Sequence, residues 1–300
     1  FLDFKKGFFI FYFIKFHNRD KGIKILLLKN NSNYCFIMNL DLTGRNAIVC
    51  GSTQGIGKAI AIELALLGAN IILIARNQEK LIDARNSLDT TKGQVHNFIV
   101  ADFSIPPQLK LVVEDYIELN DLEVNILINN TGGPAGGPIE DAKTDEFLQT
   151  FSNHLICNHI LVQATKEGMK KSGYGRIINI ISTSVKQPLN GLGVSNTIRG
   201  AVASWSKTLA NELGEHGITV NNVLPGATDT VRLKSIIENK ATKAGGNADA
   251  IKQDMANQVP MKRIAQPEEV ANAVAFLASP AASYINGINV PVDGGRTKSL

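Results

Sequence analysis

The segment Gly51-Ser52-Thr53-Gln54-Gly55-Ile56-Gly57 has three glycines at a spacing that can hold a phosphate group. It follows the apolar run Asn46–Cys50 and precedes a segment whose apolar residues recur at helical spacing. Glycine allows a positive φ and a close approach of the backbone to a pyrophosphate, and a helix N-terminus offers free N–H groups. A ligand-free glycine turn is the alternative, but the flanking strand and helix favour a dinucleotide site. Its expected contacts are Gly51, Ser52, Gln54, Gly55, Ile56 and Gly57.

The end of the second apolar run distinguishes the two nicotinamide dinucleotides. A site for NAD usually has an acid there, which accepts a hydrogen bond from the ribose 2′-OH. This chain has Arg76 followed by Asn77, and no acid occurs from Asn70 through Gln78. A guanidinium suits a 2′-phosphate because it makes charge-assisted, often bidentate hydrogen bonds. We therefore predict NADP(H) as the cofactor, with Arg76 and Asn77 in contact with it; a solvated arginine at a helix end is the alternative.

Two later segments extend the predicted site. Asp102 follows the third run and could bind the adenine amino group, although an aspartate before Ser104-Ile105-Pro106 could also cap a helix. The segment Asn129-Asn130-Thr131-Gly132 closes the fourth run. Asparagine there can stabilise the strand end, and the glycine lets the cofactor pass. We expect Asp102, Asn129, Thr131 and Gly132 to contact the cofactor.

These residues need a scaffold that brings the ends of several runs together. From Asn46 onward, short apolar runs alternate with longer segments of helical spacing, such as Lys58–Leu67 and Val202–Leu213. Most runs are continuously apolar, as strands buried on both faces are. The pattern predicts a single α/β domain, a Rossmann-type doubly wound parallel sheet of about seven strands with helices on both faces. The expected strands are Ala47–Cys50, Ile71–Ile74, Asn97–Val100, Asn125–Ile128, Arg176–Ile181, Thr219–Val223 and Asn289–Val292.

Composition narrows the function classes. The 300 residues are 44% hydrophobic, which is ample for one large core. The cysteines Cys35, Cys50 and Cys157 have neither disulfide nor metal-ligand spacing, which fits a cytoplasmic protein without a metal site. Residues 1–37 contribute +5 to the net charge of +4, so the remainder carries −1. This balance gives no electrostatic case for nucleic-acid binding.

The first 37 residues differ from the rest of the chain. They contain eight of the 13 Phe, and Met38 then opens a conventional domain start. We interpret residues 1–37 as an extension, non-native or disordered, that precedes a domain over 38–300. The alternative is a targeting segment, because Lys5 and Lys6 precede the apolar run Phe8–Ile14. That run is far shorter than the roughly 20 residues that span a bilayer, so no membrane partner is expected.

From Met38 to about Gly295 the chain resembles the short-chain dehydrogenase/reductase family, in particular the 3-oxoacyl-carrier-protein reductase type. The resemblance implies a seven-stranded Rossmann domain, usually a homotetramer. It also implies cofactor contacts from Pro225 and Gly226 and a nicotinamide contact from Thr230. We expect a substrate lid at about 231–259, within which the Gly-, Asn- and Lys-rich stretch Asn239–Asn247 is predicted to be a mobile loop. The matching residues are Gly51, Gly55, Gly57, Asp102, Asn129-Asn130-Thr131-Gly132, Asn153, Ser182, Pro225-Gly226, Thr230, Pro260-Met261-Lys262-Arg263, Pro267-Glu268-Glu269-Val270 and Val292-Asp293-Gly294-Gly295.

The resemblance also implies a catalytic tetrad of Asn, Ser, Tyr and Lys, and here the chain departs from the family. Asn153 and Ser182 match, but Ser195 stands at the tyrosine position, thirteen residues beyond Ser182, and Arg199 at the lysine position. An aliphatic hydroxyl is a far weaker acid than a phenol, and an arginine stays protonated. We hypothesise that a water replaces the phenol and is oriented by Ser182, Ser195 and Arg199, which also binds the ribose. The alternative is that Ser195 and Arg199 are helix residues with no catalytic part.

The sequence thus favours an NADP(H)-dependent oxidoreductase that interconverts a carbonyl and an alcohol on a small molecule, with atypical proton transfer. One alternative is a catalytically silent NADP-binding sensor or scaffold protein. A weaker one is another reaction on the same scaffold, such as dehydration or epimerisation. His154, which follows Asn153 and faces about 100° away on an α-helix, is predicted to have a surface or core role.

Overall fold

The computed structural model describes residues 38–299, apart from the side chains of residues 243 and 244. The extension proposed for residues 1–37 therefore lies outside the described residues. No helix in the described part of the chain has the length and apolar character needed to cross a membrane.

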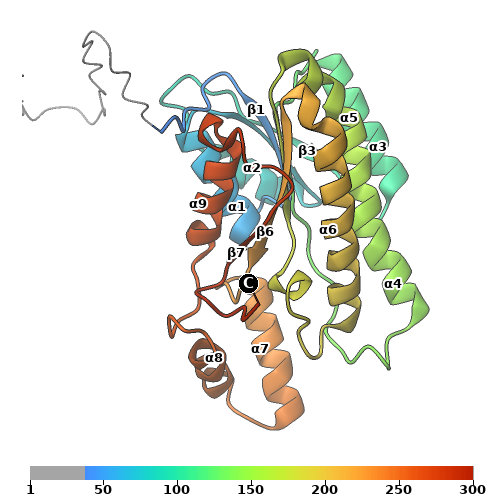
Figure 1. Cartoon of the computed structure of the whole chain (residues 1–300), viewed down its shortest axis with the longest axis vertical. Coiled ribbons are helices and arrows are strands. Elements are labelled where there is room, and N and C mark those ends of the chain that lie inside the picture. The colour runs from blue at the N-terminus through green and yellow to red at the C-terminus, as the bar shows by residue number, and fades with distance from the viewer. Residues whose placement is uncertain (1–37, 300) are drawn as a thin grey trace, which may run out of the picture. The chain divides into compact units, whose positions relative to one another are not determined.

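Seven strands of the described chain form one parallel sheet in the order β3-β2-β1-β4-β5-β6-β7 (Figure 1). The chain leaves β1 toward β2 and β3, and then crosses back to β4 on the other side of β1. The strand order reverses there, and in such sheets ligands bind beyond the carboxyl ends of the strands at this point. The strands are β1 (Asn46–Cys50), β2 (Asn70–Ala75), β3 (Asn97–Val100), β4 (Ile126–Asn129), β5 (Gly175–Ile180), β6 (Ile218–Pro225) and β7 (Asn289–Val292).

Helices cover both faces of the sheet and bury two separate cores. Residues of one strand point alternately into these cores: Ala47 and Val49 pack with α1, α2 and α9, whereas Ile48 and Cys50 pack with α3, α5 and α6. This double burial explains why the strands are continuously apolar, and it confirms the predicted doubly wound sheet. The helices on the two faces are α1 (Gly55–Leu66), α2 (Gln78–Asn86), α3 (Pro106–Leu119), α4 (Thr144–Phe151), α5 (Cys157–Ser172), α6 (Gly193–Leu213) and α9 (Pro267–Ala278).

A chain of asparagine amides ties together the last four strands of the sheet. Asn129 Nδ2 donates to Asn179 Oδ1 at 2.8 Å, and Asn179 Nδ2 donates to Asn222 Oδ1 at 3.0 Å. Asn222 Nδ2 then donates to Asn289 Oδ1 at 2.8 Å. A buried amide without a hydrogen-bond partner lowers the stability of the fold. The hydrogen bonds between these four asparagines therefore fix the relative positions of the strand ends.

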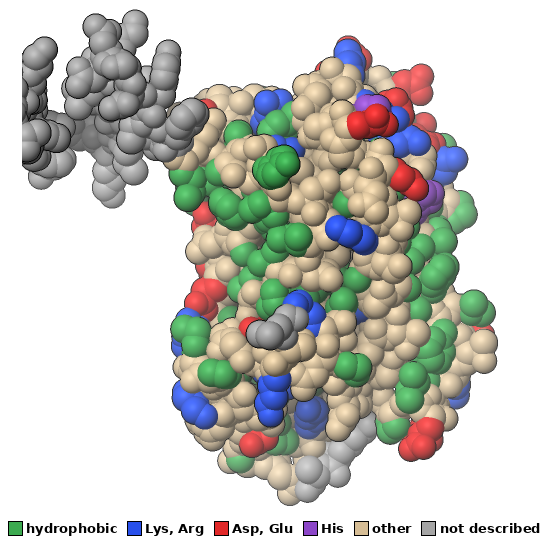
Figure 2. Space-filling view, in the orientation of Figure 1, with side chains coloured by type: hydrophobic (Ala, Val, Ile, Leu, Met, Phe, Trp, Pro, Cys, Tyr) green, Lys and Arg blue, Asp and Glu red, His purple; other side chains and the backbone are tan. Residues whose placement is uncertain are grey.

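The predicted lid consists of two helices, α7 (Val231–Ala244) and α8 (Ala248–Asn257), with a small apolar cluster of their own that includes Leu233 and Ile237. The prediction of a mobile loop over Asn239–Asn247 was wrong for most of this stretch. Helix α7 continues to Ala244 and ends where Gly245 adopts a φ of 62°. The Lys, Ala and Thr residues before it tolerate a helix, whereas glycine adopts this left-handed conformation without steric cost. Several separate Lys and Arg side chains lie on the molecular surface around α7 and α8 (Figure 2).

Candidate active site

A cavity of about 1550 Å³ lies along the carboxyl ends of the strands. Small-molecule sites usually measure roughly 300–1,000 Å³, so this one has room for a long ligand together with a smaller one. Most of the predicted site residues line it. They are Gly51, Gln54, Gly55, Ile56, Gly57, Arg76, Asn77, Asp102, Thr131, Gly132, Asn153, Ser182, Ser195, Arg199, Pro225, Gly226 and Thr230.

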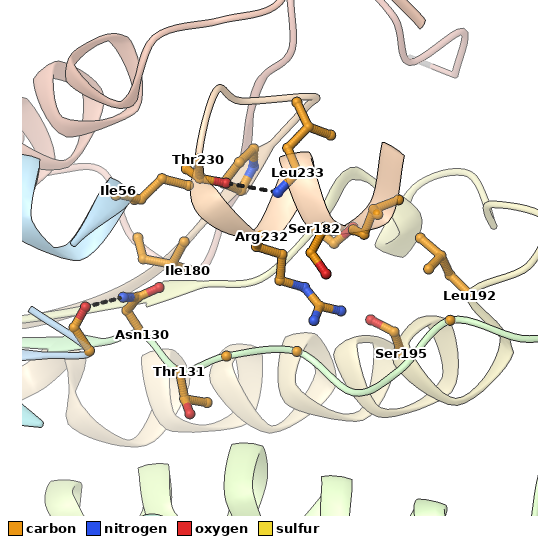
Figure 3. Close-up of a pocket in the computed structure, with 18 of the residues that line it drawn as sticks. Ile56, Asn130, Thr131, Ile180, Ser182, Leu192, Ser195, Thr230, Arg232 and Leu233 are labelled. Carbon is orange, nitrogen blue, oxygen red and sulfur yellow. Dashed lines mark hydrogen bonds between the residues drawn. The ribbon is translucent and has the colours of Figure 1, made fainter. Parts of the chain in front are cut away.

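Two predicted cofactor residues, Ser52 and Asn129, have side chains outside the cavity wall. Ser52 is fully buried and its hydroxyl donates to Ile74 O at 3.4 Å, while Asn129 is held in the asparagine chain. A cofactor contact from these two residues would therefore come from the backbone, and the Asn129 side chain stabilises the strand end, as predicted. The neighbour of Asn129, Asn130, lines the cavity instead (Figure 3). Its Nδ2 donates to Cys50 O at 3.1 Å. Successive residues at a strand end face opposite ways, and the sequence alone did not decide which asparagine faces the ligand.

The glycine turn leaves space at the start of α1. A Cβ atom on Gly57 would stand 2.2 Å from Gly51 O, so no side chain fits there. The N-cap residue of α1, Gln54, makes no side-chain capping hydrogen bond, and the first turn holds no acid. The N–H groups and the positive end of the helix dipole therefore face the cavity uncompensated, which suits an anionic phosphate.

An ion pair marks the end of the cavity beyond β2 and β3. Arg76 Nη1 lies 4.0 Å from Asp102 Oδ2, with 76% of the Arg76 side chain exposed. Asp102 also accepts a hydrogen bond from Ser104 N at 2.9 Å. This bond is the largest cause that holds the pKa of Asp102 below its ordinary value, and Arg76 adds to it. The carboxylate therefore stays ionised and can accept from an amino group.

The same end of the cavity holds a second cation, Lys80, in the first turn of α2. Asn77 caps this helix, because its Oδ1 accepts from Lys80 N at 2.9 Å. Arg76 and Lys80 thus flank a helix N-terminus, an arrangement that fits a phosphate. Lys80 was not among the predicted site residues, although a lysine four residues after Arg76 could have indicated it from the sequence.

The opposite end of the cavity holds the two predicted hydroxyls. Ser182 follows β5, and its Oγ accepts from Ser184 N at 3.1 Å, which leaves its O–H available as a donor. Ser195 lies in the first turn of α6. Figure 3 shows both hydroxyls directed toward the guanidinium of Arg232.

Arg199 lies one turn farther along α6 and is 8% exposed. Its Nη1 donates to Ile180 O at 2.6 Å, at the end of β5. Burial, followed by the charge of Arg232, lowers the pKa of Arg199 to about 10. Arg199 is therefore still a cation at neutral pH, held by the backbone with its remaining N–H groups available.

A π-helix over Ser152–Ile156 separates α4 from α5 and places Asn153 at the cavity. With its amide nitrogen toward Phe103, Asn153 donates to Phe103 O at 2.8 Å. His154 is 3% exposed and belongs to the core, one of the two roles predicted for it. Burial, followed by the charge of Arg199, lowers the pKa of His154 to about 2, so it is neutral and offsets no charge.

Arg232 is the functional candidate that the sequence analysis missed at this end. It lies in the first turn of α7, and its Nη2 donates to Pro134 O across the cavity. A Cβ atom on Gly133 would stand 3.2 Å from that Nη2, so the glycine gives the guanidinium room. Nothing in the sequence around Arg232 indicated that this arginine points toward Ser182 and Ser195.

Within residues 38–299, no group of three or more His, Cys, Asp or Glu residues could hold a metal ion.

The chain is similar to known reductases over most of its length. The family model described as enoyl-(acyl carrier protein) reductase matches residues 51–297. The 3-oxoacyl-[acyl-carrier-protein] reductase FabG of Pseudomonas aeruginosa is 33% identical over 264 residues, which cover 87% of this chain and 100% of that protein. The NADPH-dependent reductase BacG of Bacillus subtilis is 29% identical over 259 residues, which cover 86% and 100%. The crystal structure of L-sorbose reductase from Gluconobacter frateurii, complexed with NADPH and L-sorbose, is similar with a TM-score of 0.82 and 32% identity, and covers 88% of this chain and 100% of that one.

Proposed function

The chain belongs to the short-chain dehydrogenase/reductase family, and on this premise we propose that it is an NADP(H)-dependent oxidoreductase that interconverts a carbonyl and an alcohol. The observation that carries the proposal is the pairing of an uncapped α1 N-terminus with Arg76, which stands where an acid would bind a 2′-OH. The similarity to BacG, named as NADPH-dependent, and to a reductase complexed with NADPH supports it. When bound, the nicotinamide supplies or accepts the hydride.

The residues present fit this cofactor along the whole cavity. Arg76 and Lys80 would hold the 2′-phosphate, and the first turn of α1 would hold the pyrophosphate. Thr230 lies against Gly55, because a Cβ on that glycine would stand 3.1 Å from Thr230 Cγ2. In this structure the Thr230 hydroxyl also caps α7, since it accepts from Leu233 N at 3.2 Å (Figure 3). Its contact with the nicotinamide amide stays a proposal.

We expect Arg76→Ala to weaken NADPH binding by about 10- to 100-fold, because hydrogen bonds to charged groups contribute about 1.5–3 kcal/mol. NADH, which has no 2′-phosphate, should lose much less affinity. Fluorescence titration of both dinucleotides measures the two dissociation constants. Arg85→Ala is the matched control, because Arg85 stands in the last turn of α2 and does not line the cavity. Equal losses for NADPH and NADH would contradict the assignment of Arg76 to the 2′-phosphate.

For the proton transfer we propose that a water takes the place of the family's phenol. Ser182 donates to the carbonyl oxygen, while Ser195 and Arg199 hold the water that delivers the proton to that oxygen. The positive charges of Arg199 and Arg232 favour the negative charge that develops there. The polar character of Ser195 and its position in the cavity wall support this role.

A carbonyl panel with NADPH consumption followed tests the oxidoreductase directly. We expect Ser195→Ala to lower kcat/KM by about 10-fold and Arg199→Ala by about 100-fold, since one removes a neutral hydrogen bond and the other a charged one. Both variants should also change the solvent isotope effect on kcat, because they disturb the proton donor. Ser195→Tyr combined with Arg199→Lys restores the family's groups and serves as the gain-of-activity control. Unchanged turnover in both alanine variants would remove these residues from the mechanism.

A catalytically silent NADP-binding protein is the second candidate, and the absence of tyrosine at 195 and of lysine at 199 favours it. Both candidates bind NADPH, so only turnover separates them. No NADPH consumption by the chain, together with activity of the Ser195→Tyr/Arg199→Lys variant, would favour the silent protein.

We further propose a homotetramer in the cytoplasm. The family resemblance supports the assembly, and the two described cysteines, Cys50 and Cys157, are free and buried, as suits a reducing compartment. Mass photometry of the purified chain measures the assembly.

A further inference from the structure

The catalytic end of the cavity is lined by cations and lacks acids. Arg199 and Arg232 lie at this end, and Lys240 and Arg296 also line the cavity. Within the described chain, the cavity wall contains one acid, Asp102, and that carboxylate lies beside Arg76 at the far end. A cavity with this charge distribution attracts anions to the end where the reaction takes place.

Arg199 and Arg232 have no internal counter-charge. Neither forms a salt bridge to a carboxylate in the part of the chain that the structure describes. The neighbouring acid Asp229 pairs with Lys252 at 3.7 Å and does not line the cavity. Two like charges in a partly desolvated site disfavour one another, and an anion bound between them would remove that cost.

The guanidinium of Arg232 is placed to receive such an anion. One of its N–H groups binds Pro134 O, and a guanidinium has five donors, so the others can bind a carboxylate in a bidentate manner. Figure 3 shows this guanidinium between Ser182 and Ser195, whose hydroxyls can add hydrogen bonds to the same ligand. Because Ser182 is also the proposed partner of the carbonyl oxygen, the anionic group must lie close to the reacting carbon.

We propose that the substrate is an oxo acid, whose carboxylate lies one or two carbons from the reacting carbonyl and is bound by Arg232. This inference rests on the proposed oxidoreductase function and names its substrate class. The cofactor's pyrophosphate is a second possible source of anionic charge. The geometry favours the substrate, since Arg232 faces the two catalytic hydroxyls, whereas the uncapped α1 N-terminus already serves the pyrophosphate.

The first experiment compares benzoylformate with its neutral methyl ester as substrates. In Arg232→Gln we expect the ratio of kcat/KM for the acid to kcat/KM for the ester to fall by about 10- to 100-fold, as for the loss of a charge-assisted bond. Arg232→Lys keeps the charge and should recover part of the preference. The matched control is Lys234→Gln, which removes a charge from the same turn of α7 but outside the cavity wall, and it should change the ratio less than about twofold. A ratio that Arg232→Gln leaves unchanged would overturn the proposal.

The second experiment does not depend on turnover. Benzoate is titrated calorimetrically into the protein saturated with NADP⁺, and we expect Arg232→Gln to weaken its binding by about 10-fold or more. The dissociation constant of NADPH is measured in parallel. If Arg232→Gln weakens only the binding of NADPH and leaves that of benzoate unchanged, the guanidinium binds the cofactor and the inference fails. If benzoate binding depends on Arg232 but no oxo acid is reduced, the oxidoreductase proposal fails while the anion site stands.

Discussion

We expect Gly57→Ala to weaken NADPH binding by more than about 100-fold. A Cβ atom at this position would stand 2.2 Å from Gly51 O and 2.7 Å from Asn130 Nδ2, far inside any van der Waals contact. Both neighbours are fixed, because Gly51 N donates to Ile74 O at 2.8 Å and Asn130 is bound to the end of β1. The added methyl therefore has to push the start of α1 away from the turn, and the helix N-terminus that faces the phosphates moves with it.

Fluorescence titration with NADPH, together with a thermal melt of each variant, measures this effect. Gly200→Ala is the matched control, because it adds the same methyl to a helix at a position where, apart from the adjacent residues and backbone of its own helix, no described atom lies within 4 Å of the new Cβ. That variant should keep its affinity for NADPH and gain roughly 0.5–1 kcal/mol in the free energy of unfolding, since alanine favours a helix more than glycine does. Wild-type affinity in Gly57→Ala would show that the glycine turn does not hold the cofactor.

The second large effect is expected at Ser182. Ser182→Ala should lower kcat/KM for carbonyl reduction by about 10²- to 10³-fold, which is the usual consequence of removing one preorganised donor to a developing oxyanion. The hydroxyl is preorganised here because Ser184 N–H donates to its oxygen at 3.1 Å, which leaves the O–H available as a donor. Steady-state kinetics on the carbonyl panel, with the NADPH dissociation constant measured separately, assign the loss to the chemical step.

Ser184→Ala provides the control for Ser182→Ala. The Ser184 hydroxyl is buried without a hydrogen-bond partner in the described structure, while its backbone N–H is the group that positions Ser182. Removing the hydroxyl should therefore leave kcat/KM unchanged and should not destabilise the protein. A Ser182→Ala enzyme that keeps its activity within about threefold would mean that another group binds the carbonyl oxygen.

Local sequence patterns were enough for the sheet and for much of the cofactor site. The strand Asn46–Cys50, the glycine turn and helix α1 are contiguous, so their spacing alone predicted a helix N-terminus suited to a phosphate. Arg76 could also be predicted as a cofactor residue from local sequence, because it directly follows a strand. The strands agree with the structure to within one or two residues at their ends, since burial on both faces leaves a continuous apolar run.

The tertiary structure decided which side chains of these segments face the ligand. It placed Asn130 rather than Asn129 in the cavity wall, and it turned the Ser52 side chain into the core. It also continued α7 through most of a stretch that the sequence had suggested as a loop. Side-chain direction at a strand end depends on packing against both neighbouring layers, which a single segment does not contain.

By itself, then, the sequence determined the parallel sheet and the NADP(H) cofactor, and it led to the proposals that Arg76 binds the 2′-phosphate and that Ser195 and Arg199 stand at the positions of the family's reacting groups. Only the tertiary structure showed that Arg232 joins them. Its hydrogen bond to Pro134 spans 98 positions of the chain and depends on how α7 packs relative to the segment that follows β4. Local spacing carries the chemistry of a turn or a helix end, whereas a charge brought in from a distant helix is fixed by the packing of the whole domain.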